Sequence, residues 1–190
     1  MHQQEEVMDD RPFLRLRIAS TTLVAVADLM LLAWQYFHGG VPSHHFFDRA
    51  DMPAISNGWG GLLLPLMTWF LLGRVQKRIA TQGDAAKRYA LIGFVCALLF
   101  GVLLSVFFTL GDDTVSNSMF ESLFVIALVA PIYRAEYLLG LVLGMAYTFG
   151  GVLPSIVGSV VAIITMVIYC FVRAGLLRVV AMLVGVAKRA

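Results

Sequence analysis

The stretch YALIGFVCALLFGVLLSVFFTL, residues 89–110, decides the fold class of this chain, because it is long, apolar and free of charged residues. An α-helix needs about 20 apolar residues to cross the hydrocarbon core of a bilayer. Lys87 and Arg88 precede the stretch, and Asp112 and Asp113 follow it. The sequence therefore predicts a transmembrane helix with its basic end on one side of the membrane and its acidic end on the other.

Similar apolar runs recur along the whole chain, which has 190 residues and is 59% hydrophobic. A soluble domain is usually about 45–50% apolar. We therefore predict an all-α fold, a polytopic integral membrane bundle of about six transmembrane helices in a single membrane domain, residues 1–190. The expected spans are residues 18–37, 58–72, 89–110, 119–132, 137–149 and 155–172.

The segments outside these spans have distinct characters. We expect residues 1–17 to form a polar cytoplasmic tail and residues 38–57 to form a structured extracytoplasmic loop, which is apolar enough to fold over the bundle. Residues 173–190 form a tail or an interfacial helix. The fourth and fifth spans are short, so residues 119–153 either cross the membrane twice or form a re-entrant hairpin buried in protein.

Positive charge is strongly one-sided in this arrangement. With the N-terminus inside, all of the 14 Lys and Arg residues except Arg49 face the cytoplasm. Because Lys and Arg in short loops orient polytopic proteins, we predict that both termini are cytoplasmic, in a membrane of the bacterial inner (plasma) type. The basic residues sit at helix ends, not on a soluble face with interleaved aromatic residues, so the lipid bilayer is the expected partner and nucleic acid is not.

Small residues recur at four-residue intervals in two of the spans. They are Gly93, Ala97, Gly101 and Ser105 in the third span, and Gly140 and Gly144 in the fifth. This spacing lets helix backbones approach closely in lipid. It predicts close packing within the chain or, alternatively, the seam of a homo-oligomer.

Asp28 lies in the middle of the first span, where a carboxylate is costly and is a candidate functional group. Thr21 and Gln35 lie seven residues before and after it. Seven-residue steps drift by only about 20° on an ideal helix, so the three side chains share one face. We predict that this polar stripe faces the bundle interior. It either carries an ion or a proton, or only joins helices through a protonated, hydrogen-bonded Asp28.

The loop of residues 38–57 holds the other candidate group of polar residues: His38, His44, His45, Asp48 and Asp51. A short helix over residues 43–50 would place His44 and Asp48 on one face. Imidazole and carboxylate groups could then converge on a divalent metal such as zinc, copper or iron. They could equally form an acid–base pair or a proton relay, or remain solvated loop residues.

Two glutamates, Glu121 and Glu136, are expected to have structural rather than functional roles. Ser118 and Glu121 match the S-x-x-E capping box, which predicts a helix start there. Glu136, in a predicted cytoplasmic turn, is expected to be a surface charge or a partner of Arg134.

Three functional hypotheses follow from these features. The first is small-solute, ion or proton-coupled transport that uses Thr21, Asp28 and Gln35. The second is a membrane-embedded metal-dependent enzyme that uses the loop histidines and aspartates. The third is a non-catalytic scaffold or complex subunit that binds a partner helix along the small residues of the third span. We rank them in that order.

Overall fold

The computed structural model describes residues 11–41, 43–45, 54–176, 178 and 182, and these residues are almost entirely helical. The α-helices within this part of the chain are α1 (Arg11–Phe37), α2 (Gly60–Gln82), α3 (Asp84–Thr109), α4 (Asp113–Ile126), α5 (Ala135–Phe149) and α6 (Val152–Val167). A π-helical turn, η3 (Ile168–Val172), extends α6. Two three-residue strands, β1 (Ser43–His45) and β2 (Ala54–Ser56), pair antiparallel, and a 3-10 turn, η2 (Asn57–Trp59), leads into α2.

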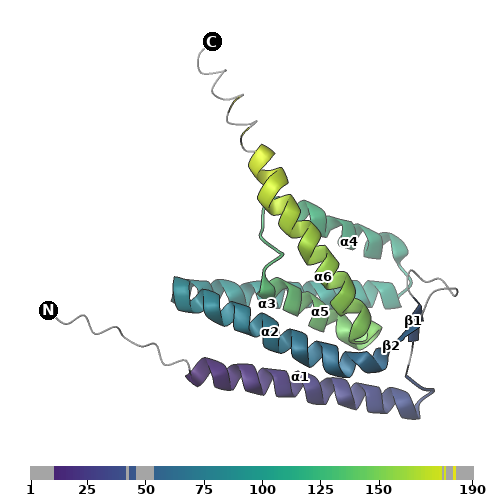
Figure 1. The fold of residues 1–190 in the computed structure, drawn as a ribbon. Helices are drawn as coiled ribbons and strands as arrows, with labels where there is room; N and C mark the ends of the chain where they lie inside the picture. Colours follow the sequence, from purple (N-terminus) through teal and green to yellow (C-terminus); the bar gives the residue numbers. More distant parts are fainter. Residues whose placement is uncertain (1–10, 42, 46–53, 177, 179–181, 183–190) are drawn as a thin grey trace.

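Four of the helices lie side by side, with α1 at the edge of the bundle against α2, and α3 and α5 on the other side of α2 (Figure 1). The α3–α5 interface is the most extensive in the molecule. Helix α6 crosses the others obliquely and packs on α5 and α2. Helix α4 lies at the far side from α1, next to α3. The interface between α1 and α2 therefore sits at one side of the bundle, away from α4.

Three helices are long and apolar enough to cross a membrane: Arg11–Phe37, Asp84–Thr109 and the continuous helix Val152–Leu176. Helix α5 is also apolar, but its 15 residues span only about 22 Å at 1.5 Å per residue. Helix α4 has 14 residues, and both fall short of the roughly 30 Å hydrocarbon core. Large apolar side chains are exposed on the outside of the bundle, among them Leu23, Phe70 and Leu91. An apolar exterior of this extent is suited to lipid.

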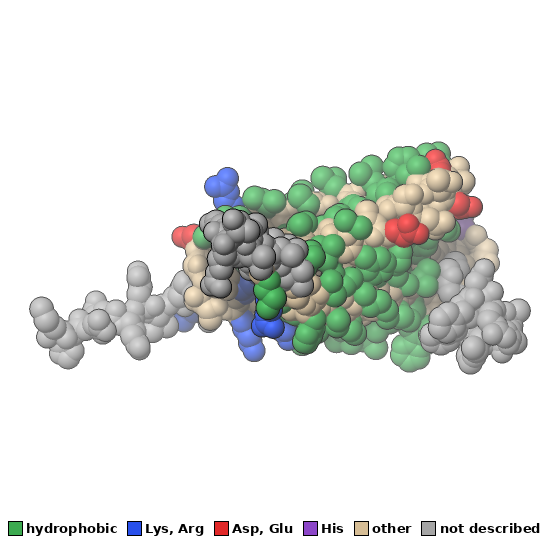
Figure 2. Space-filling view, turned by 90° about the horizontal axis from the view of Figure 1, so that it is seen from above, with side chains coloured by type: hydrophobic (Ala, Val, Ile, Leu, Met, Phe, Trp, Pro, Cys, Tyr) green, Lys and Arg blue, Asp and Glu red, His purple; other side chains and the backbone are tan. Residues whose placement is uncertain are grey.

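Charged side chains collect at the ends of the bundle. In Figure 2, Lys and Arg gather toward one end, and most of the Asp and Glu side chains in view lie toward the other, with apolar side chains between them. This one-sided distribution is the feature from which the sequence predicts a cytoplasmic and an outer face.

Several predicted boundaries are wrong. Helix α4 begins at Asp113, and the Asp112 side chain caps it by accepting a hydrogen bond from the Val115 N–H at 3.0 Å. Ser118 is therefore inside the helix, so the capping box predicted at Ser118 and Glu121 does not form. Helix α4 ends at Ile126 rather than at residue 132, and Pro131, which cannot continue a helix, keeps it from resuming before α5.

The short helix over residues 43–50 that would pair His44 with Asp48 does not form over its first three residues. These residues form strand β1, with His44 opposite Ile55 and His45 opposite Ala54. A helical i, i+4 pairing of His44 with Asp48 cannot start from a strand. Asp48 and Asp51 lie outside the described residues.

Candidate functional site

Asp28 is the one residue of α1 that is buried, with only 5% of its surface exposed. It faces the start of α2: a Cβ placed on Gly60 would lie 3.5 Å from the Asp28 Oδ2 atom. That oxygen has no hydrogen-bond partner among the residues that the structure describes. Most buried polar groups in proteins are hydrogen-bonded, so a carboxylate oxygen without a partner inside the bundle requires an explanation.

Two glycines let the backbones of α2 and α6 meet beside this carboxyl group. A Cβ on Gly60 would lie 3.0 Å from the Gly151 Cα, so the start of α2 and the start of α6 touch backbone to backbone. The N-termini of two helices therefore converge close to Asp28.

Two threonine hydroxyls extend the polar region along the same interface. Thr21 Oγ1 on α1 and Thr68 Oγ1 on α2 are both buried, and neither has a hydrogen-bond partner within the described part of the chain. Arg17 lies beside Gly73, and Asp28 lies beside Gly60. This antiparallel register places Thr21 level with the turn of α2 that carries Thr68.

Gln35, the third residue of the predicted stripe, lies at the end of this interface opposite Arg17. The Asn57 Nδ2 atom donates a hydrogen bond to Gln35 Oε1 at 3.4 Å, and Asn57 Oδ1 accepts one from the Val152 N–H at 3.5 Å. Asn57 is almost completely buried and joins α1 to the start of α6. Gly150, whose φ is +74°, passes so close to Asn57 that a Cβ there would overlap its side chain.

Arg17 closes the basic end of the same interface. Its Nε–H donates a hydrogen bond to the Trp69 carbonyl at 2.8 Å, and its guanidinium lies 3.7 Å from the centre of the Trp69 ring. Gly73 leaves room for the guanidinium group. The α1–α2 interface thus runs from a fixed arginine at one end to a hydrogen-bonded amide pair at the other, with oxygens that lack partners between them.

The position and the partner of Glu136 differ from those that the sequence predicts. It is buried, with 4% of its side chain exposed, and it forms an ion pair with Arg78 of α2, Nη1 to Oε1 at 2.6 Å. The prediction of a surface charge or a partner of Arg134 is wrong, because the first turn of α5 packs into the bundle next to Gly93 of α3.

The small residues predicted to pack helices lie where α3 meets α5. A Cβ on Gly144 would meet the Leu98 carbonyl oxygen, and one on Gly140 would meet that of Phe94. A Cβ on Gly101 would lie 2.6 Å from the Leu141 carbonyl oxygen. The Ser105 hydroxyl donates to the Gly144 carbonyl at 3.5 Å. Gly93 faces Tyr137 and Glu136 at the end of the same interface, and Ala97 faces Gly140.

The loop residues proposed as metal ligands do not form a site in the part of the chain that is described. His38 stacks on Trp34, and its Nδ1–H donates to the Trp34 carbonyl at 2.8 Å. No three His, Cys, Asp or Glu residues within the described ranges are placed to hold a metal ion. Because Asp48 and Asp51 lie outside those ranges, the metal site in residues 38–57 stays a prediction.

Sequence reasoning located Asp28 and missed the residues around it. Gly60 and Asn57 come from α2 and its leading turn, and only the pairing of α1 with α2 brings Gly60 to Asp28 and Asn57 to Gln35. A signal was present at Asn57, because an amide at the head of an apolar run needs a hydrogen-bond partner once it is buried.

Comparisons with protein-family models, with curated proteins and with solved structures find no match for this chain. Its function is therefore argued from the geometry of the site.

Proposed function

We propose that this protein carries a proton or a small cation through the membrane, with Asp28 as the binding group at the α1–α2 interface. The observation that supports this most directly is the buried Asp28 Oδ2 atom without a partner. A carboxyl group at membrane depth costs roughly 2.5–3.5 kcal/mol on insertion scales, and such residues commonly mark ion paths and proton relays.

Further unpartnered oxygens lie along α1 and α2 toward Arg17. Thr21, seven residues and so about 10 Å along α1 from Asp28, and Thr68 of α2 offer hydroxyl oxygens that lack partners among the described residues. They are too far from Asp28 to hold the same ion and would serve as a separate step on a path for a proton, an ordered water or a hard cation, to which oxygen groups are suited. Two pockets in the molecule are lined by residues of α3 to α6 and the α4–α5 connection, with none from α1 or α2.

The proposal includes a topology. We propose six crossings with both termini on the cytoplasmic side of a plasma membrane of the bacterial inner-membrane type. The charge distribution supports it, because Lys and Arg concentrate at one end of the bundle (Figure 2). In this topology the Asp28 carboxyl group lies between the arginine-rich cytoplasmic end and the outer amide pair of Gln35 and Asn57.

The test is ion flux into vesicles that contain the purified full-length protein. An imposed membrane potential should drive protons, Na⁺ or K⁺ into the wild-type vesicles faster than into protein-free ones. Asp28→Asn keeps the shape and removes the charge, so its flux should fall to the protein-free level, and Asp28→Glu should restore part of it. Glu121→Gln, an exposed carboxyl group on α4, is the control and should match the wild type.

Two outcomes would contradict the proposal. Wild-type vesicles that conduct no better than empty ones for all three ions would exclude this transport activity. Equal flux in the wild type and in a folded Asp28→Asn variant would show that any path lies elsewhere.

A further inference from the structure

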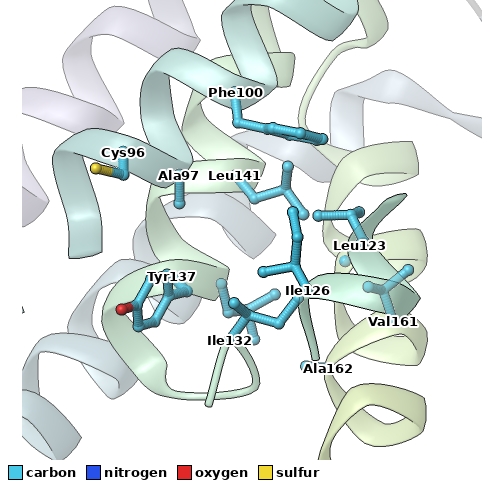
Figure 3. Close-up of a pocket in the computed structure, with 12 residues that line it drawn as sticks. Cys96, Ala97, Phe100, Leu123, Ile126, Ile132, Tyr137, Leu141, Val161 and Ala162 are labelled. Atoms are coloured by element: carbon cyan, nitrogen blue, oxygen red, sulfur yellow. The ribbon is translucent and has the colours of Figure 1, made fainter. Parts of the chain in front are cut away.

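Helix α4, at the side of the bundle away from α1, buries few of its residues. Ser116 and Leu123 are the buried residues of this helix. Two pockets separate α4 from α3, α5 and α6, with volumes of about 200 Å³ and about 140 Å³. Figure 3 shows the smaller one, with Leu123 and Ile126 of α4 pointing toward Leu141 and Val161.

The two pockets follow one another along the same four helices. The larger is lined by residues 104–108 of α3 and residues 116–120 of α4, and the smaller by residues 96–100 and 123–126. Both are almost wholly apolar. One packed cluster, formed by Leu104, Leu123, Leu141, Met145 and Val161, lies between them, and its members line one pocket or the other. We call the two pockets together the α4 crevice. The α4 residues that line them run from Ser116 to Ile126, about 15 Å along the helix, and an alkyl chain that occupied both pockets would displace side chains of this cluster.

The α4 crevice has one polar end. Ser116 is 8% exposed, and its Oγ atom has no hydrogen-bond partner among the described residues. Three other serine hydroxyls, those of Ser122, Ser155 and Ser159, donate to a backbone carbonyl three or four residues earlier in the chain at 2.6–2.7 Å. Ser116 lines the larger pocket beside Asn117, so its hydroxyl is free for a ligand in that pocket.

Charge near this end restricts the ligand further. Asp112, Asp113 and Glu121 are exposed on α4 or just before it, and the residues that line the two pockets include no charged side chain. An anionic head would face carboxylates here, whereas a cationic or neutral head would not. An apolar, elongated cavity beside exposed lipid-facing side chains suits an alkyl chain.

We propose that the α4 crevice binds a membrane amphiphile, with its alkyl chain along the crevice and a hydroxyl or amine head hydrogen-bonded to Ser116. The occupant comes from the surrounding bilayer rather than from water, because the walls are apolar and the neighbouring helix surfaces are of the kind that faces lipid. This site is separate from Asp28 and does not depend on the proposed transport.

The test uses a long-chain aliphatic amine that carries a photoreactive diazirine in mid-chain. It is added to full-length protein in phosphatidylcholine vesicles, and the labelled peptides are mapped by mass spectrometry. Labelling should concentrate on the crevice-lining residues of α3, α4 and α6, and an excess of unlabelled amine should suppress it. The same probe with a carboxylate head should label these residues several-fold less.

Two variants test the two ends of the crevice. Ser116→Ala should reduce the apparent affinity for the amine roughly five- to tenfold, the effect of one hydrogen bond. Ser118→Ala, exposed on the same helix, is the matched control and should leave it unchanged. Ala162→Phe should fill the smaller pocket and block labelling. If that variant does not fold, competition by unlabelled amine on the wild-type protein tests the same point.

The proposal is overturned if the label spreads over all lipid-facing surfaces in proportion to their exposure. It is also overturned if the carboxylate probe labels the crevice as well as the amine does, or if a folded Ser116→Ala variant binds the amine as tightly as the wild type.

Discussion

Two buried carboxyl groups in this protein have opposite surroundings. Glu136 is paired with Arg78 at 2.6 Å, whereas Asp28 Oδ2 has no partner among the described residues. A buried charge that has an ion-pair partner joins helices, and one without a partner is available to a ligand. The difference assigns Glu136 to the architecture of the bundle and Asp28 to its proposed activity.

Glu136→Gln should destabilise the protein strongly, because it leaves the Arg78 guanidinium partly buried without its counter-charge. We expect a loss of about 3 kcal/mol in the free energy of unfolding, measured by denaturation in detergent micelles. The double variant Arg78→Met, Glu136→Met should recover most of that loss, since it removes both charges. Glu121→Gln is the control at an exposed position. Stability unchanged by Glu136→Gln would show that the pair contributes nothing to the fold.

The residues that could be predicted from sequence are those whose chemistry conflicts with their local environment. Asp28 stands out because it interrupts an apolar run. The partner of Glu136 could not be predicted, because Arg78 is 58 residues away in the chain and Arg134 is a nearer candidate. Local sequence reports where a charge lies, and only tertiary packing determines which group neutralises it.

Helices α3 and α5 are held together by close contact between their backbones. Gly101, Gly140 and Gly144 each face a carbonyl oxygen of the opposite helix, at distances that leave no room for a side chain. In lipid there is little hydrophobic force between helices, so such contacts contribute through dispersion and close packing. This interface fixes the central pair on which α2, α4 and α6 pack.

Gly144→Ala should separate α3 from α5, because its Cβ would collide with the Leu98 carbonyl oxygen and with backbone that cannot move aside. We expect a loss of about 2 kcal/mol or more in unfolding free energy. Gly175→Ala is the matched control, since a Cβ there meets nothing within 4 Å. Thermal unfolding of both variants measures the difference, and equal midpoints would rule out a tight crossing at Gly144.

Helix positions were largely predictable from apolar runs, and helix ends were not. The expected spans overlap all six α-helices, but α2 continues well beyond residue 72 to Gln82. Hydropathy marks where a helix meets lipid and does not mark where the backbone stops being helical. The start of α4 was misplaced because the Asp112 side chain supplies the cap that was assigned to Ser118.

The whole molecule combines an apolar exterior with charged ends (Figure 2). Three helices have the length and hydropathy to cross a membrane. The sequence predicts six crossings, so the other three are not established by length and hydropathy. Helix α2 carries Arg74, Lys77 and Arg78 in its second half, and α4 and α5 are short. The charges lower the mean hydropathy of α2, and α4 and α5 are short for a membrane-spanning helix. The number of crossings therefore depends on how far the ends of these three helices extend into the lipid headgroups.

Reporter fusions along the chain test the six-span topology. Fusions at Gly83 and Lys188 should report the cytoplasm, and a fusion at Asp113 should report the exterior, because Lys and Arg bias orients short loops. An exterior signal at Lys188 would mean an odd number of crossings. Cytoplasmic signals at all three positions would show that α3 does not cross the membrane.

The central claim is that the Asp28 carboxyl group exchanges a proton or binds a cation inside the folded protein. Infrared difference spectroscopy of the full-length protein in bilayers tests it most directly, by comparing the carboxyl bands of the wild type and Asp28→Asn as pH or Na⁺ and K⁺ concentration is stepped. We predict a carboxyl band that responds to pH or to one of the cations in the wild type and is missing from Asp28→Asn. Identical difference spectra for the two proteins under every condition would contradict the claim.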